Sequence, residues 1–169
     1  MAISLYDACI PAMVRGLTNM SAILDKAATY AAAKKIDSTV LAQTRLYPDM
    51  HPLSRQVQIA CDTAKGAAGR LAGIEAPKHE DNETTLAELK ARIAKTLDFL
   101  KTVSPAQMTG DDARTIELKF PNGAWKFTAS SYVSQFVLPN FYFHTTMIYA
   151  LLRKSGLEIG KGDFLGAIQ

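Results

Sequence analysis

The chain has 169 residues with a hydrophobic fraction of 48% and a charged fraction of 21%, proportions that exclude disordered and collagen-like proteins. Its formal net charge is +3, but Lys and Arg are spread along the chain rather than gathered into a basic stripe with interleaved aromatic residues, which argues against nucleic-acid binding. Neither Cys9 nor Cys61 belongs to a CxxC motif, so we expect both to be small, buried, apolar residues. The length suits a single domain over residues 1–169.

The N-terminal stretch MAISLYDACIPAMVRG has no basic region ahead of an apolar core and no cleavage site of small residues, so it does not have the pattern of a signal peptide. The longest apolar run, near residues 136–152, is interrupted by Pro139, Asn140 and His144, which makes it unsuitable as a membrane span. These features predict a cytoplasmic protein without a membrane partner.

Apolar residues at spacings of three and four predict two long helices in the first half of the chain. The first runs over residues 4–34 and contains Pro11, where we expect a kink or a restart because proline lacks a backbone N–H. A short helix is expected over residues 38–42, and Pro52 fits the first position of the second long helix. The predicted buried stripes are Met13, Leu17, Met20, Leu24, Ala27 and Ala31, then Leu53, Val57, Ala60, Ala64, Ala67 and Leu71.

A third long helix is predicted to begin after Thr85, because TLAE has the pattern of a capping box in which Thr85 and Glu88 satisfy each other's backbone N–H groups. This helix should end at residues 102–104, ahead of Pro105. Its predicted buried stripe is Leu86, Leu89, Ile93, Leu97 and Leu100.

The segment TIELKFPNGAWKFTA alternates with a period of two and predicts a β-hairpin with a two-residue turn at Asn122 and Gly123. We expect its aromatic face to lie on the helices as a lid, because an isolated hairpin is only marginally stable. The expected cross-strand pairs are Phe120 with Trp125, Leu118 with Phe127, Ile116 with Ala129 and Lys119 with Lys126.

A fourth long helix is predicted over residues 130–154, with a bend at Pro139. Apolar residues surround it almost completely, which indicates burial on several sides or at a subunit interface. The glycine-containing tail that follows carries Phe164 and Leu165, which we expect to fold back against the helices. The whole pattern predicts an all-α bundle of four helices with a small β-hairpin before the last one.

Three motifs, PDMHPLSRQVQIACDTAKG, LPNFYFHTTMIYALLRKSG and IGKGDFLG, together with this order of elements, resemble a bacterial family of unknown function within the DinB/YfiT-like four-helix bundles. The resemblance covers nearly the whole chain. It implies a DinB-like up-down-down-up topology and a homodimer.

Members of that superfamily often bind a divalent metal ion, such as zinc or nickel, through one histidine of the second helix and an HxxxH pair in the fourth. Some of them are metal-dependent thiol transferases or hydrolases. The pair works because side chains four residues apart share a helix face. Here Asn140 and His144 match its spacing, so an amide replaces one imidazole ligand. The resemblance therefore implies His144 as a metal ligand, with Asp62 or His51 as further candidates.

Three roles remain open for His144. It can be a core histidine that is hydrogen-bonded to Asp62, Gln58 or Asn140, since buried polar groups are normally paired. It can instead be a metal ligand, or a general base whose pKa is tuned by Asp62. His79 lies among charged residues and is expected to be a solvated loop residue.

The candidate site lies between the second and fourth helices, where we expect Asn140 and Gln58 in a pocket under Trp125 and Phe127 of the hairpin. The favoured hypothesis is a non-catalytic scaffold that binds a small molecule or a protein partner and keeps a degraded metal site. The alternative is a metal-dependent hydrolase or thiol transferase, which requires a third ligand to converge on His144.

Overall fold

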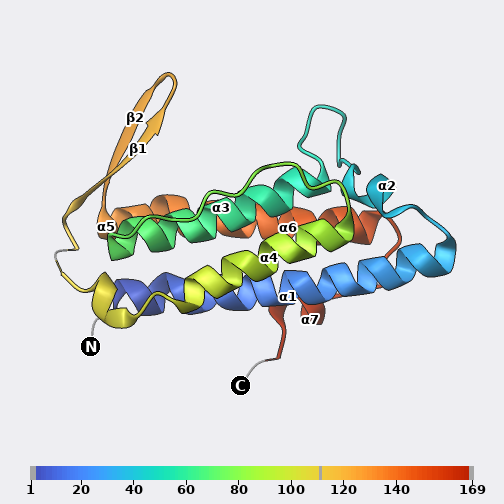
Figure 1. Ribbon diagram of the computed structural model, residues 1–169, viewed down its shortest axis with the longest axis horizontal. Helices are drawn as coiled ribbons and strands as arrows, with labels where there is room; N and C mark the ends of the chain where they lie inside the picture. Colours follow the sequence, from blue (N-terminus) through green and yellow to red (C-terminus); the bar gives the residue numbers. More distant parts are fainter. Residues whose placement is uncertain (1–2, 111, 168–169) are drawn as a thin grey trace.

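Four long helices form the body of the molecule (Figure 1), which the computed structural model describes over residues 3–110 and 112–167. The long helices are α1 (Leu5–Lys34), α3 (Leu53–Ala72), α4 (Leu86–Lys101) and α6 (Leu138–Lys154). The shorter elements are α2 (Ser38–Ala42), η1 (Pro105–Met108), β1 (Thr115–Phe120), β2 (Gly123–Thr128), α5 (Ala129–Ser131), η2 (Tyr132–Val137) and α7 (Lys161–Leu165).

Helices α1 and α6 run in one direction, and α3 and α4 run in the other (Figure 1). Helix α1 packs mainly against α4 and α6, and α3 also packs mainly against these two helices. Because α3 and α4 are parallel, the connection between them, residues 73–85, must return along the length of the bundle. The molecule is an all-α, DinB-like up-down-down-up four-helix bundle with a small hairpin, which confirms the predicted fold class.

The predicted stripes form the core of the bundle. All of their members are buried except Leu97, which is partly buried. Helices α1 and α6 approach each other closely at Gly16, where a Cβ atom would lie 2.7 Å from a ring carbon of Phe141. The missing side chain therefore leaves room for the fully buried Phe141 ring.

Local signals set the helix ends largely as predicted. Thr85 and Glu88 form the expected capping box, with Glu88 N–H donating to Thr85 Oγ1 at 3.2 Å and Thr85 N–H donating to Glu88 Oε2 at 2.9 Å. Pro52 is the residue before α3 rather than its first residue. Helix α1 continues through Pro11, so the restart considered there does not occur.

The turn of the hairpin differs from the prediction. Phe120 pairs with Gly123, so Pro121 and Asn122 are the two central residues of the turn. The predicted register would place Pro121 in the ladder, where its missing N–H leaves a hydrogen bond unmade. At the first central position the fixed φ of proline is favourable. Asn122 accordingly does not adopt the positive φ that the predicted turn required.

This register is shifted by two residues, and an even shift keeps the same side chains on each face of the hairpin. The expected opposition of Lys119 and Lys126 is therefore wrong, because Glu117 lies opposite Lys126 and relieves the repulsion between like charges. The observed pairs include Ile116 with Phe127, Leu118 with Trp125 and Lys119 with Ala124.

The helical run that leads into α6 contains one turn of altered winding. In η2, a π-helix, the N–H of Leu138 donates to the carbonyl oxygen of Val133, five residues earlier. Pro139 follows directly, and its ring would collide with the carbonyl group four residues before it in a regular α-helix. The wider π turn makes room for this ring. The irregularity expected at Pro139 thus lies in the residues that precede it.

Helix α6 is apolar but not buried on all sides. Phe141 is fully buried, whereas Tyr142 and Phe143 are 40% and 56% exposed. No helix within the described ranges combines the length and the apolar character that crossing a lipid bilayer requires.

The C-terminal tail folds back against α1 as predicted. Asn19 Nδ2 donates to the carbonyl oxygen of Phe164 at 3.0 Å, and Lys26 forms an ion pair with Asp163. The Phe164 ring also packs edge-on against Tyr149 of α6. The tail therefore contacts both α1 and α6.

Candidate functional site

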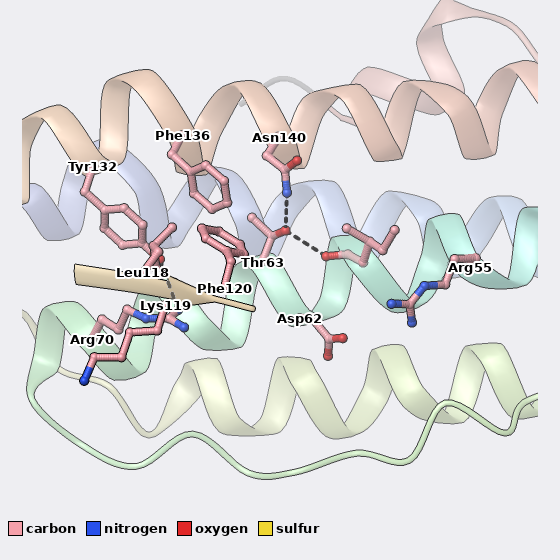
Figure 2. Close-up of a pocket in the computed structure, with 11 residues that line it drawn as sticks. Arg55, Asp62, Thr63, Arg70, Leu118, Lys119, Phe120, Tyr132, Phe136 and Asn140 are labelled. Carbon is pink, nitrogen blue, oxygen red and sulfur yellow. Dashed lines mark hydrogen bonds between the residues drawn. The ribbon is translucent and has the colours of Figure 1, made fainter. Parts of the chain in front are cut away.

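A cavity of about 280 Å³ lies between α3, α6, η2 and the first strand of the hairpin (Figure 2). Its size is near the lower limit for small-molecule sites. Helix α3 contributes residues from three successive turns and, two turns further on, Arg70, because positions three, four and seven apart share one helix face. The lining residues of α3 are Arg55, Ile59, Asp62, Thr63 and Arg70.

One wall of the cavity is aromatic. Leu118 and Phe120 of β1 lie against Tyr132 and Phe136 of η2, and the rings of Tyr132 and Phe136 are stacked with centroids 5.8 Å apart. Because η2 is a π-helix, its side chains at positions four apart are turned relative to those of a regular helix. The π turn thus contributes to the directions in which the Tyr132 and Phe136 side chains point.

Trp125 and Phe127, the predicted lid residues, pack against the aromatic residues of this wall. Trp125 packs on Phe120 and Phe136 at centroid distances of 4.8 and 6.1 Å, and Phe127 packs on Tyr132 and Phe136 at 5.9 and 6.1 Å. Neither ring lines the cavity itself. The hairpin extends away from the four long helices (Figure 1) and Trp125 is 56% exposed, so the expected lid forms only in part, through residues of the first strand that line the cavity.

The polar end of the cavity is a hydrogen-bonded chain between α6 and α3. Asn140 Nδ2 donates to Thr63 Oγ1 at 2.7 Å, and Thr63 Oγ1 donates to the carbonyl oxygen of Ile59 at 2.8 Å (Figure 2). The Thr63 hydroxyl is therefore used as both acceptor and donor. Asn140, predicted as a pocket residue, does line the cavity.

The charged side chains at the cavity are Arg55, Arg70, Lys119 and Asp62. Arg70 Nη1 donates to the Tyr132 hydroxyl oxygen at 3.2 Å. Burial raises the pKa of Tyr132, so this phenol stays neutral. Arg55 is paired with Asp81 and also donates to Gln58 Oε1 at 3.1 Å. Sequence reasoning did not identify the arginines, because no local pattern distinguishes them from solvated helix residues.

Asp62 points away from the hydrogen-bonded chain and toward α4 (Figure 2). Its Oδ1 accepts from Arg92 Nη2 at 2.8 Å and lies 3.1 Å from Lys65 Nζ. The carboxylate is thus neutralised by two cations on the side of α3 that faces α4.

His144 lies farther along the same interface and is bonded to Gln56, a partner that the sequence did not indicate. Its Nδ1 is 2.7 Å from Gln56 Oε1, while Gln56 Nε2 donates to the carbonyl oxygen of His51 at 3.2 Å. The second bond orients the amide, so His144 Nδ1 carries the proton and Nε2 carries the lone pair. Burial, assisted by the charges of His51 and Arg55, lowers the pKa of His144 to about 4, and the ring is neutral near pH 7.

A model of the DUF1993 family, a domain of unknown function, matches residues 5–165. The chain belongs to this family. A crystal structure of a DinB family member protein from Shewanella denitrificans is similar, with a TM-score of 0.89 and 45% sequence identity over 97% of this chain and 93% of that chain. A search among curated proteins found no match. The resemblance to a bacterial family among the DinB-like bundles is thereby confirmed.

The metal ligands expected from the DinB resemblance are distributed around α3 rather than gathered at one point. Asp62 is bonded to Arg92 on the α4 side, whereas His144 is bonded to Gln56 on the α6 side. His51 is exposed ahead of α3. Within the described ranges, no three His, Cys, Asp or Glu side chains are grouped so that they could hold a metal ion. The residues present in this DUF1993 chain do not fit the three-ligand centre of the superfamily.

The side of α3 that faces α4 carries a second polar cluster around Arg92, whose side chain is only 1% exposed. Arg92 forms ion pairs with Asp62, Asp81 and Glu83 at 2.8, 2.9 and 3.0 Å. Gln58, predicted as a pocket residue, instead donates to Glu83 Oε2 at 2.9 Å. Through Asp81 and Glu83, the cluster links the α3–α4 connection to both helices.

His79 belongs to the same connection and is partly buried, although the sequence predicted a solvated residue. Burial lowers its pKa. The sequence of residues 73–85 is that of a polar loop, but the ion pairs of Asp81 and Glu83 with Arg92 hold this segment against α4.

Proposed function

We propose that this DUF1993 protein is a non-catalytic binding bundle that holds a small molecule in the cavity beneath the hairpin. The observation that carries the proposal is the state of the three groups in the lining that could otherwise act on a substrate. Asp62 is neutralised by Arg92 and Lys65, the Thr63 hydroxyl donates its proton to the carbonyl oxygen of Ile59 and accepts from Asn140, and Tyr132 accepts from Arg70. A general base or nucleophile must instead be free to reach the reacting atom.

The cavity also has the mixed lining that ligand sites commonly show, with an apolar wall and a few placed polar groups. Trp125, the only tryptophan in the sequence, packs on two rings of that wall and gives a built-in optical probe. We expect bound compounds to raise the melting temperature and to change Trp125 fluorescence.

The test is a small-molecule screen on the full chain by thermal shift and fluorescence, followed by an Ile59→Phe variant that fills the cavity. Ile59 is half-buried and lines the site, so the variant should fold and lose the bound compounds. Hits that bind the variant equally well, or that the protein converts into products, would contradict the proposal.

A metal-dependent hydrolase or thiol transferase with a site between α3 and α6 is the second candidate, favoured by one observation. The His144 Nδ1–H group is held by a carbonyl oxygen, as in many metal-bound histidines, and Nε2 retains its lone pair. Elemental analysis and titration with zinc and nickel, monitored through the His144 ring by NMR, test this candidate. Stoichiometric metal that shifts this ring and is lost in His144→Ala supports it; an unmoved ring at saturating zinc and nickel eliminates it for those ions.

We also propose that the protein forms a homodimer through α6, supported by the exposure of two large side chains of this helix, Tyr142 and Phe143. Light scattering coupled to size-exclusion chromatography should give twice the chain mass for the native protein. A Phe143→Ser variant should reduce this mass toward that of one chain. A monomeric native protein at all accessible concentrations eliminates the proposal.

A further inference from the structure

The charges at the cavity do not balance within the cavity itself. Of its four charged residues, Arg55 is paired with Asp81, and Asp62 is paired with Arg92 and Lys65. Arg70 and Lys119 form no ion pair with a carboxylate of the described residues. Both are exposed residues at the rim of the cavity, and Figure 2 shows the Lys119 amine extending away from Phe120 and Phe136. Two cations at the rim of the cavity are therefore available to an anion that reaches them, Arg70 from the last turn of α3 and Lys119 from β1.

Arg70 is held in place from two sides. Tyr132 accepts one hydrogen bond from Nη1, and the guanidinium group lies directly over Gly66, one turn earlier on α3. A Cβ atom at Gly66 would lie 2.6 Å from Arg70 Nη1, closer than real Cβ contacts allow. The missing side chain at Gly66 thus lets Arg70 lie back along the helix. The guanidinium group keeps further N–H donors for a second acceptor.

The part of the cavity next to these cations is flat and apolar. Phe120, Phe136 and Leu118 line it. An anionic group that is bound by a guanidinium and an ammonium group in a partly enclosed site forms strong charge-assisted hydrogen bonds. An aromatic or similar flat body would at the same time cover the two phenylalanine rings.

We propose that the cavity selects a small organic anion, whose carboxylate or other oxyanion group binds Arg70 and Lys119 at the rim while its flat apolar body lies against Phe120 and Phe136. This inference rests on the proposed function and adds the chemical class of the ligand. Gly66 is a positioning residue in this arrangement, because it acts only through Arg70.

The experiment compares three probes of similar size and different charge: 4-ethylbenzoate, 4-ethylbenzamide and 4-ethylbenzylammonium. Each is titrated into the full chain, with backbone amide shifts to locate the site and calorimetry to measure the affinity. We expect the benzoate to bind at least about tenfold more tightly than the amide, with shifts in the cavity residues and with weakening in salt. The ammonium compound should bind most weakly.

Four variants decide which groups read the charge. Arg70→Gln and Lys119→Gln should each reduce the preference for benzoate over benzamide severalfold. Gly66→Ala should reduce it as well although Arg70 is still present, and its melting temperature should not fall, because alanine favours a helix more than glycine does. Lys126→Gln, on the second strand and outside the cavity lining, is the matched control and should keep the full preference.

Equal binding of benzoate and benzamide in the cavity, or an unchanged preference in Arg70→Gln, overturns the assignment of an anion but leaves the small-molecule site intact. Failure of all three probes to perturb the cavity residues up to their solubility limits counts against the proposed function as well. A Gly66→Ala variant that keeps the native preference removes the positioning role of Gly66 alone.

Discussion

The side of α3 that faces α6 and the side that faces α4 are both polar, but they differ in charge. Toward α6, two pairs of uncharged side chains meet: Gln56 with His144, and Thr63 with Asn140. Toward α4, the buried cation Arg92 is surrounded by carboxylates. The uncharged pairs thus lie on the side of α3 that borders the cavity with the aromatic wall. The cavity next to Arg92, on the charged side, has no such wall.

This difference separates charges that hold the fold from charges that are left for a ligand. Removal of one member of a buried ionic cluster leaves its partners uncompensated and is costly. Removal of a neutral hydrogen bond costs less. Removal of an exposed cation such as Lys119 should cost almost nothing in stability. Stability measurements can therefore rank the groups before any ligand is known.

The largest effect is expected for Arg92→Ala. This change leaves Asp62, Asp81 and Glu83 without their common cation and should lower the free energy of unfolding by about 3 kcal/mol. The value is at the low end for buried pairs because Asp62 and Asp81 are 38% and 39% exposed. Urea denaturation measures it.

The matched control for Arg92 is Lys90→Ala on the same helix. Lys90 pairs with Asp25 at the surface, where both side chains are well exposed, so its loss should cost less than about 1 kcal/mol. Similar losses for both variants would show that the α4 side of α3 is no more dependent on charge than the surface.

The second largest effect is expected from acid, through protonation of His144 on the α6 side of α3. The His144 pKa is about 4 in the folded protein and near its ordinary value of 6.5 when unfolded, so the unfolded chain binds the proton more readily. The free energy of unfolding should therefore fall as the pH is lowered from about 6.5 to about 4. Below pH 4 the His144 ring is protonated in both states and should cause no further loss. The total loss is about 3 kcal/mol.

Other groups also titrate in this range, so the native protein must be compared with His144→Gln at each pH. The difference in unfolding free energy between the two proteins should change between pH 6.5 and 4 and be constant below pH 4. A difference that is independent of pH would mean that the His144 ring is not held neutral by burial.

The neutral pair at the cavity should have a smaller effect. Asn140→Ala removes the 2.7 Å hydrogen bond to Thr63 at the polar end of the cavity and should cost about 1 kcal/mol. A double-mutant cycle with Thr63→Val isolates the interaction itself. A coupling energy indistinguishable from zero would mean that the two side chains do not form this bond in solution.

The smallest effect concerns the cysteines, both of which are free and buried. Burial raises the pKa of Cys9 and of Cys61 to about 12, so neither forms a thiolate near pH 7. Iodoacetamide should leave the native protein unmodified and modify both residues in urea, as mass spectrometry can show. Modification of Cys61 in the native protein would reveal opening of the bundle interior.

Local patterns predicted most of the fold. The capping box at Thr85, the stripes at spacings of three and four and the alternation of the hairpin each depend on neighbours within a few residues. The hairpin register was the exception, because the Asn122–Gly123 signal competed with the missing N–H of Pro121. The preference of Pro121 for the turn outweighed the Asn122–Gly123 signal, although both are readable along the chain.

The cavity was less predictable than the fold. Asn140 and Asp62 lie in its lining, but Gln58, Trp125 and Phe127 lie beside it. Arg70 reaches the cavity because Gly66 leaves space and Tyr132 supplies an acceptor, a combination of residues on two elements. No spacing within α3 reveals that combination.

The sequence by itself determined the helices, their buried faces and the family to which the chain belongs, because these depend on periodicity and on motifs that lie along the chain. Only the tertiary structure decided that His144 meets Gln56, that Asp62 turns to Arg92, and that Arg70 and Lys119 share one cavity. These pairings depend on the rotation and axial position of packed helices, and a shift of a few ångströms would exchange one polar partner for another.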